Sequence, residues 1–271
     1  MAITTGDGYI AAAKQLARIC KTQTATTVAA QWHTLLDRNG IPGAGSLSVG
    51  NTANGLVPTA ATAGFPTIKA FGGGNTGYLT GLNFSNSVAC RMHLYDRLFH
   101  VGSISLTSLA TTTLTSQPSF SSRVPGGTDY TSTEIWLEIN TAISATATSV
   151  SVGYTNEAGT TGRSTGAAEA VPPYITGRLI QMPLQAGDKG VQRIDSVTVG
   201  GTVASAGTVN VIVARPLVTS MRVPVAGAGD VLGLDRTGMV QVWADSALWL
   251  IIAADSTSSG APDLLMEVTD G

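Results

Sequence analysis

Charged side chains are scarce in this sequence. They make up 12% of the 271 residues, about half of the roughly 25% that is usual in soluble domains. The 15 basic and 17 acidic residues leave a net charge of −2, and Lys and Arg stand singly rather than in runs. A nucleic-acid-binding protein needs a basic patch or stripe. The composition therefore excludes that class, and we expect no nucleic-acid partner.

Cysteine and histidine are also few, with two Cys and three His in the chain. Cys20 and Cys90 stand among apolar residues, which predicts buried, reduced thiols and no disulfide framework. Cys90-x-x-His93 has half of a zinc-binding spacing, but no second Cys or His pair completes it. We therefore expect neither a metal nor another cofactor.

Long apolar runs are missing as well, since none approaches the roughly 20 residues that cross a bilayer. The N-terminal MAITTGDGY has neither a positive segment nor an apolar segment of the kind found in signal peptides. We expect no membrane partner and assembly in a cytoplasm. Asn83-Phe84-Ser85 matches the N-glycosylation sequon, but we expect no glycan there because the protein would not pass through the secretory pathway.

The apolar share is 43%, so the exterior must be built largely from Thr, Ser, Gly, Ala and Asn. Such a surface does little to repel neighbouring molecules. This composition favours a protein whose outside is covered by partners or by copies of itself, that is, a homo-oligomer. A plain Thr-rich β protein is the alternative.

The stretch 225–254 predicts three short strands near the C-terminus. Val231–Leu234 and Met239–Trp243 flank Asp235–Gly238, a tetrapeptide typical of a hairpin turn. Ala247–Ala254 is the most apolar run of the chain, and we expect it to be a strand buried on both faces.

Residues 8–38 differ from the rest because their apolar residues recur at helical spacing. Tyr9, Ala13, Leu16 and Cys20 would share one helix face, with Asp7 or Thr5 as the N-cap. A second helix would carry Val28, Trp32 and Leu35/Leu36, and would end at Arg38-Asn39-Gly40 before Pro42. Two placements remain open: a helical hairpin on its own sandwich, or an arm that docks on a neighbouring subunit.

Most of the remaining chain predicts strands. Residues 41–87 form an extended Gly-, Ala- and Thr-rich segment with scattered apolar anchors, namely Leu47, Val57, Phe65, Ile68, Phe71, Tyr78 and Leu82. Further strands are expected at 88–95, 135–139, 149–155, 174–184, 191–199, 207–215, 218–223 and 264–268. The pattern predicts a mainly β fold, an antiparallel β-sandwich or jelly roll with a short N-terminal helical region. We divide it into an arm (1–45), a joining segment (46–125) and a sandwich core (126–271), with one interwoven domain over 46–271 as the alternative.

No set of residues indicates catalysis. Glu134 and Glu138 lie four residues apart on one strand face, about 13 Å, whereas glycosidase pairs lie roughly 5–9.5 Å apart. We interpret them as solvated glutamates on an outer face. His33, His93 and His100 lack a framed nucleophile, because no Gly-x-Ser-x-Gly elbow is present. We expect a protein that is not an enzyme and has no catalytic residues.

Two glycine-containing loops are weak candidates for ligand sites. Gly72–Gly77 lacks the Gly-Lys-Ser/Thr ending that holds phosphate. Asp255–Gly260 offers a single carboxylate where a calcium loop needs several. Both are expected to be plain loops.

Several stretches resemble structural proteins of tailed-bacteriophage virions, in the class that decorates or cements a capsid shell. They are LYDRLFHVGS (94–103), QPSFSSRVPGGTDYTSTEIWLEINT (117–141), YTNEAGTTGR (154–163), MPLQAGDKGVQRIDSVTV (182–199), VARPL (213–217) and WADSALWLIIAADSTSSGAPDLLMEV (243–268). The resemblance covers most of the chain beyond residue 40 and brings no active residue with it. It implies a virion protein that binds across major capsid protein subunits and copies of itself and stabilises the shell. The alternatives are a tail or surface module that binds a receptor or glycan, and a hydrolase with an unrecognised site.

Overall fold

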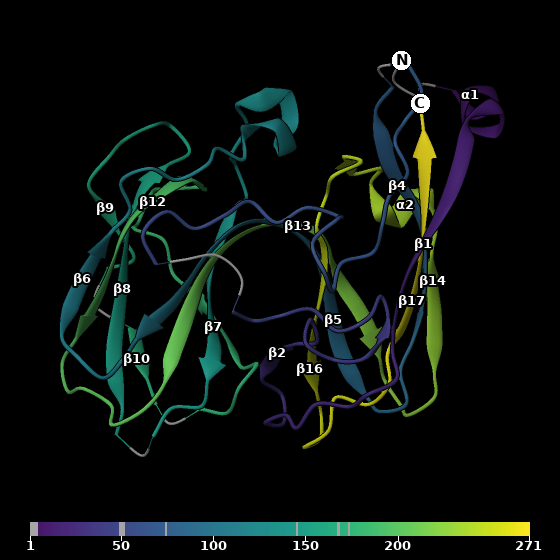
Figure 1. The fold of residues 1–271 in the computed structure, drawn as a ribbon. Helices are drawn as coiled ribbons and strands as arrows, with labels where there is room; N and C mark the ends of the chain where they lie inside the picture. Colours follow the sequence, from purple (N-terminus) through teal and green to yellow (C-terminus); the bar gives the residue numbers. More distant parts are fainter. Residues whose placement is uncertain (1–4, 49–51, 74, 145, 167–168, 173) are drawn as a thin grey trace. The chain divides into compact units, whose positions relative to one another are not determined.

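The computed structural model describes residues 5–48, 52–73, 75–144, 146–166, 169–172 and 174–271. The chain forms two units, each assembled from separate segments (Figure 1). Unit 1 contains Met1–Ser46, Thr59–Asp96 and Leu217–Gly271, and unit 2 contains Leu47–Pro58 and Arg97–Pro216. Residue 45 lies in unit 1 and residue 125 in unit 2; the division into 1–45, 46–125 and 126–271 stays a prediction.

Unit 1 contains a sheet, called sheet A here, that joins both ends of the chain. Its strand order is β14 (Gly229–Leu232), β4 (Gly77–Ser85), β17 (Asp263–Asp270), β1 (Ala13–Lys21) and β3 (Gly40–Ile41). β15 (Gln241–Val242) also pairs with β4. Figure 1 shows β1 in purple next to β17 in yellow.

The second sheet of unit 1 consists of β2 (Trp32–Thr34), β16 (Leu248–Ala254) and the unit 1 parts of two long strands. These are β5 (Cys90–Ser105) and β13 (Thr208–Val223), which each give one part to each unit. Apolar side chains from both sheets form one core, including Leu79, Met92, Ile252 and Met266. Unit 1 is therefore a β-sandwich.

Unit 2 is also built from two sheets that enclose an apolar core of their own. One sheet has the order β10 (Glu169–Val171), β8 (Thr148–Asn156), β12 (Val191–Gly200) and β6 (Ala110–Thr113), and β9 (Arg163–Ser164) pairs with β8. The other contains β11 (Leu179–Met182), β7 (Glu134–Thr141) and the unit 2 parts of β13 and β5. Two 3-10 turns, η1 (Ser121–Arg123) and η2 (Pro125–Gly127), precede β7. Val152, Ile194, Leu137 and Val211 meet in the core between the sheets.

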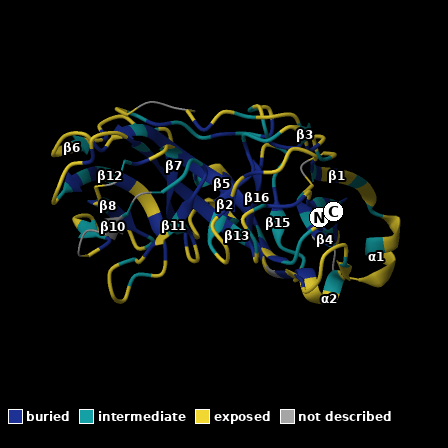
Figure 2. Cartoon of the chain, turned by 90° about the horizontal axis from the view of Figure 1, so that it is seen from below, coloured by how far each residue is buried: buried dark blue, intermediate teal, exposed yellow. Residues whose placement is uncertain are grey.

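The predicted fold class is confirmed. Strands dominate both units, their pairings are antiparallel, and the strand interiors are buried (Figure 2). A short helix, α1 (Gly6–Ala11), stands at the N-terminus with Thr5 as its N-cap. No helix in the described part of the chain has the length and hydropathy needed to span a membrane.

The long helical region predicted over 8–38 is wrong beyond α1. Ala13–Lys21 is a strand, and the second predicted helix is replaced by turns and the short strand β2. The inward residues Ala17, Ile19 and Lys21 alternate with more exposed ones. β1 pairs along its length with β17, from the other end of the chain. That partner overrides the local helical spacing, which is a weak preference by comparison.

The predicted C-terminal hairpin is also wrong, although its elements are present. β14 and β15 both pair with β4 instead of with each other. The turn between them is α2 (Leu234–Thr237), followed by Gly238 at φ 63°, a conformation that glycine adopts without strain. β16 is buried at every position, as predicted. The strands predicted at 207–215 and 218–223 are one continuous strand, β13.

The anchors predicted for 41–87 are largely confirmed. Leu47, Phe65, Ile68 and Leu82 are buried, and Val57, Phe71 and Tyr78 are half-buried. Residues 77–85 form β4 rather than a loop. Residues 49–51 and 74 of this segment, and 1–4 of the predicted arm, lie outside the described residues.

Lys21 is an unusual core residue because its side chain is buried at the end of β1. Its Nζ donates hydrogen bonds to the carbonyl oxygens of Arg38 at 3.0 Å and Pro42 at 2.9 Å. Burial lowers the pKa of Lys21 to about 8. The ammonium group thus fastens β1 to the segment that contains β3.

Replacing Lys21 tests this fastening. Lys21→Met should lower the free energy of unfolding by about 1–3 kcal/mol, because buried carbonyl groups lose their donor. Lys14→Met, on the exposed part of the same strand, should change it by less than about 0.5 kcal/mol. Urea denaturation of both variants measures the difference, and equal effects would contradict the assignment.

Candidate functional site

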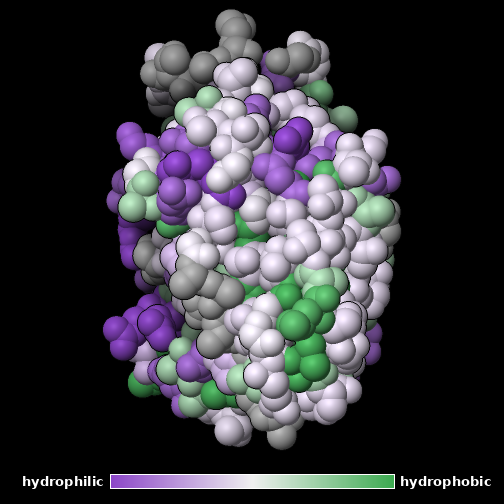
Figure 3. Space-filling view, turned by 90° about the vertical axis from the view of Figure 1, so that its left-hand side faces the viewer, coloured by the Kyte–Doolittle hydropathy of each residue, from purple (hydrophilic) through white to green (hydrophobic). Residues whose placement is uncertain are grey.

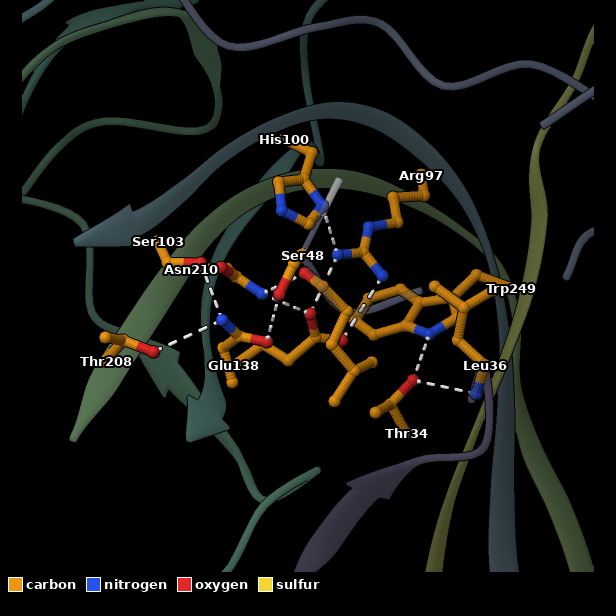
Figure 4. A network of polar contacts seen from close by, with 12 residues as sticks. Thr34, Leu36, Ser48, Arg97, His100, Ser103, Glu138, Thr208, Asn210 and Trp249 are labelled. Carbon is orange, nitrogen blue, oxygen red and sulfur yellow. Dashed lines mark hydrogen bonds and ion pairs between the residues drawn. The ribbon is translucent and has the colours of Figure 1, made fainter. Parts of the chain in front are cut away.

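The most concentrated group of buried polar side chains in the described chain lies in unit 2. Arg97 extends from β5 and Glu138 from β7, and both side chains are 0% exposed. Arg97 Nη1 donates to Glu138 Oε1 at 3.2 Å, and Nη2 donates to Oε2 at 2.9 Å (Figure 4). This bidentate geometry is the strongest form of a carboxylate–guanidinium pair.

His100 and Asn210 extend the pair to a network. Arg97 Nη2 lies 2.5 Å from His100 Nδ1; as guanidinium groups only donate, Nδ1 must be the acceptor. Asn210, opposite Glu138 in the β7–β13 register, donates from Nδ2 to Glu138 Oε2 at 2.8 Å and to the Leu47 carbonyl oxygen at 2.7 Å. Burial, and next the charge of Arg97, hold the pKa of His100 well below its usual value. The imidazole is therefore neutral.

The network lies tightly against the backbone. A Cβ atom at Gly102 would lie 2.0 Å from Asn210 Oδ1, so only glycine fits at this position of β5. From η1, buried Arg123 donates from Nη2 to the carbonyl oxygens of Arg97 at 2.9 Å and Leu98 at 3.2 Å. The polar groups thus hold β5, β7 and β13 together inside unit 2.

The prediction that Glu138 is solvated on an outer face is wrong. The face of β7 opposite Ile135 and Leu137 is also buried, with Trp136 1% and Glu138 0% exposed. Glu134 is half-buried, and it accepts a hydrogen bond from Trp136 Nε1 at 3.0 Å. A buried carboxylate requires a cationic partner, and here that partner is 41 residues away on another strand. The sequence near Glu138 therefore contains no residue that would have predicted the buried ion pair.

The three predicted histidine candidates are not brought together with a nucleophile. His33, in unit 1, is buried, and its Nδ1 lies 3.0 Å from the Gln31 carbonyl oxygen. His93 packs against the Trp32 ring at 4.1 Å between centroids. Burial, and next the charge of Arg91, lower the pKa of His93 to about 4. His100 belongs to the network in unit 2.

The spacing Cys90-x-x-His93 does not form a ligand pair. Residues three apart on a strand point to opposite faces, and both lie on β5. Cys90 is buried as predicted, and its Sγ accepts a hydrogen bond from Asn86 Nδ2 at 3.2 Å. Cys20 is only half-buried, contrary to prediction. Among the described residues, no group of three or more His, Cys, Asp and Glu could hold a metal ion.

A second polar cluster closes a loop of unit 2. Asp188, in the turn after β11, accepts hydrogen bonds from Arg163 Nε and Nη2 at 2.8 Å, from Asn156 Nδ2 at 2.8 Å and from Tyr154 Oη at 2.7 Å. The bond to Arg163 is the main reason that the pKa of Asp188 lies well below its usual range. Burial, with the carboxylate next, raises the pKa of Tyr154 to about 12. The cluster ties the turn to β8 and β9.

Near this turn, unit 2 has an open polar hollow of about 340 Å³. Its lining includes Gln117, Tyr130, Thr155, Gln192 and Arg193. The Arg193 guanidinium is paired with Asp195 at 2.7 Å, and Thr155 Oγ1 donates to Asp195 at 2.9 Å. Its lining offers hydroxyl, amide and ring groups rather than an acid–base pair.

The groups around Arg97 link three strands of unit 2. The Glu138 oxygens accept hydrogen bonds from Arg97 and Asn210, and the Nδ1 lone pair of His100 accepts one from Arg97. The arrangement fixes β5, β7 and β13 relative to one another within the sandwich of unit 2.

Comparisons with known proteins give little. No protein-family model matches the chain, and no curated protein matches it. A structure of the infectious bursal disease virus Gx strain is similar at 8% identity and a TM-score of 0.20, over 96% of this chain and 80% of that chain. A VP2 subviral particle of infectious bursal disease virus is similar at 10% identity and a TM-score of 0.20, over 96% and 80%. TM-scores this low do not establish a common topology.

Replacing Glu138 tests the buried pair. Glu138→Gln should lower the free energy of unfolding by about 3–5 kcal/mol, since it leaves the Arg97 charge uncompensated in the core. Glu134→Gln, on the same strand, should cost no more than about 1.5 kcal/mol because one hydrogen bond is affected. Urea denaturation compares the two, and a loss for Glu138→Gln no greater than that for Glu134→Gln would refute the account.

The histidines predict a pH dependence. Because the folded-state pKa values of His93 and His100 are depressed, only the unfolded chain takes up protons as the pH falls below about 6.5. Stability is therefore full above that pH and should fall by about 2 kcal/mol per histidine between pH 7 and pH 5. His93→Gln should remove one of the two contributions. Denaturation curves at both pH values measure this, and an unchanged pH dependence in the variant would contradict it.

Proposed function

We propose that this chain is a structural subunit of a virion that functions by being covered by other proteins. The observation that carries the proposal is the outer face of sheet A. There Leu16, Ile41 and Val231 are each more than half exposed, at 66%, 56% and 61%. Leu16 and Ile41 lie at the β1–β3 edge of this face and Val231 at the β14 edge, so both borders of the face offer apolar side chains to a partner.

A second part of the surface supports the same interpretation. Figure 3 shows a face made mostly of pale residues of intermediate hydropathy, with scattered hydrophilic groups and a green apolar patch. Leu109 and Val203, in unit 2, are also exposed, at 61% and 38%. A surface poor in charge lacks the repulsion that keeps copies apart. It therefore suits a component packed in many copies.

The finer proposal is a capsid decoration or cement protein of a tailed bacteriophage. Its support is the resemblance of stretches such as 117–141 and 243–268 to that class. Such a protein binds across subunits of a major capsid protein and stabilises the shell. Many weak contacts that symmetry repeats become strong through effective concentration. The proposal includes self-association, location in the virion after assembly in the host cytoplasm, and no catalytic step.

A tail or surface module that binds a glycan or receptor is the second candidate. The hollow of unit 2 favours it, because its lining includes the amide of Gln192 and the hydroxyl group of Thr161, which can form hydrogen bonds with a sugar. The two candidates differ in copy number, since a cement protein follows the capsid lattice and a tail module does not.

Quantitative mass spectrometry of purified particles tests the proposal. We expect a copy number comparable to that of the major capsid protein, because binding sites recur with each capsid subunit. A few copies per particle, together with adsorption of the isolated protein to host cells, would favour the tail module. Absence from the particles would overturn both candidates.

A further inference from the structure

β1 is an edge strand along most of its length. On one side it pairs with β17 from Ala13 to Cys20. On the other side β3 covers only Cys20 and Lys21. In the described part of the chain, no other strand pairs with β1.

The register shows which backbone groups face this open edge. Lys21 N–H donates to the Pro262 carbonyl oxygen at 3.0 Å, on the β17 side, whereas Thr22 N–H donates to the Asn39 carbonyl oxygen at 3.1 Å, on the β3 side. Alternate residues of an antiparallel strand direct their N–H and C=O groups to opposite sides. The β1–β17 register has no shift. Lys14, Leu16 and Arg18 therefore face the open edge, and none of the loop hydrogen bonds of the described residues ends on their backbone groups.

A groove of about 510 Å³ lies along this edge. Its walls include Lys14 and Leu16 of β1 and Lys69 of a neighbouring segment. Gln15 holds that segment in place, because its side-chain amide exchanges two hydrogen bonds with the backbone of Lys69, at 3.1 and 2.8 Å. The groove is thus a formed feature of unit 1.

The charges beside the groove are unequal. Lys14 Nζ donates to the Tyr9 carbonyl oxygen at 2.9 Å and lies 4.4 Å from the centroid of the Tyr9 ring, two partners that carry no net negative charge. Lys69 adds a second exposed ammonium group. The carboxylate in the wall, Asp270, accepts the neutral Gly72 N–H at 2.8 Å and therefore offsets one of the two lysine charges. Arg18 is paired with Asp263, so the wall keeps an excess of one positive charge. The edge therefore favours an anionic partner.

We propose that the edge of β1 binds an extended segment of a partner protein as an additional antiparallel strand. Main-chain hydrogen bonds to Lys14, Leu16 and Arg18 would provide the pairing, as in other strand-addition complexes. A carboxylate of the segment lies near Lys14 and Lys69, and an apolar side chain two residues away covers Leu16. This site deepens the proposed structural role and relies on it only for the partner being a neighbouring subunit of the particle.

A second copy of this chain fits the edge less well. Antiparallel pairing of β1 with itself about Leu16 would place Lys14 opposite Arg18 of the other copy, and like charges at opposed positions destabilise a strand pair. The other edge of sheet A, at β14, is blunted because Asp230 Oδ1 accepts the Val231 N–H at 2.8 Å. A segment of another protein that carries acidic and apolar residues can pair with the lysine charges and can also form hydrogen bonds with the free backbone groups of β1.

The strand β17 provides a probe, because its outward residues Asp263, Leu265 and Glu267 already alternate acidic and apolar next to β1. A fluorescent peptide DLLMEVTD, with the sequence of β17, is titrated into the full chain and followed by anisotropy. A peptide KLLMKVTK, in which lysines replace the acids, is the charge control. We expect the control to bind at least tenfold more weakly.

Matched variants locate the site. Leu16→Asp should weaken binding of DLLMEVTD at least tenfold, whereas Val231→Asp, on the same sheet face at the opposite edge, should leave it unchanged. Circular dichroism checks that both variants keep the fold. Hydrogen exchange gives the backbone signature: the peptide should slow exchange of the Leu16 and Arg18 amides at least tenfold and leave the Ala17 amide, already bonded to β17, unaffected.

Several outcomes would overturn the proposal. They are equal loss of binding in both variants, no binding of DLLMEVTD, or slow exchange of the Leu16 and Arg18 amides without peptide. Sedimentation that shows self-association of the chain, lost in Leu16→Asp, would assign the edge to a second copy instead. The peptide assay needs no particle, so its failure and absence of the chain from virions are separate results.

Discussion

A strand within a sandwich is stable only when its backbone polar groups find partners, and in this chain the partners come from far away in the sequence. β1 pairs with β17, so that the two ends of the chain lie in adjacent strands of sheet A. β5 and β13 each give one part to each unit. Each sandwich is thus assembled from segments that are separated in the sequence. Among the sheet edges that result, the stretch Lys14–Arg18 of β1 has no partner strand in the described chain.

The same requirement explains the polar interior of unit 2. Glu138 and Arg97 satisfy each other, Asn210 joins them to the Leu47 backbone, and His100 completes the set as a neutral acceptor. A buried ion pair of this kind specifies which strands lie together, because any other arrangement leaves a buried charge unpaired. Inside unit 2 the charged groups of the network are paired with each other; outside, at the edge of β1 and the outer face of sheet A, apolar and backbone groups are exposed.

Sequence reasoning succeeded where the signal is local. The alternation of Cys90, Met92 and Leu94 and the apolar run that became β16 predicted strands that the structure has, because the period of a strand acts over a few residues. Gly238 does mark a turn, but the hairpin predicted around it is absent. Sequence reasoning failed where a residue or strand far away in the sequence determines the local structure. Leu16 and Cys20 have helical spacing, but β17 makes the segment a strand, and Glu138 has the pattern of a surface residue until Arg97 is placed beside it. The candidate site at the edge of β1 follows from register, which no single sequence displays.

The central claim is that the exposed edge and outer face of sheet A are covered in the assembled particle. An electron-microscopy map of the native assembly, with this chain fitted into it, tests the claim most directly. The account predicts a continuous strand of density from a neighbouring protein beside β1, at Leu16. A map in which that edge faces solvent in every copy would contradict it.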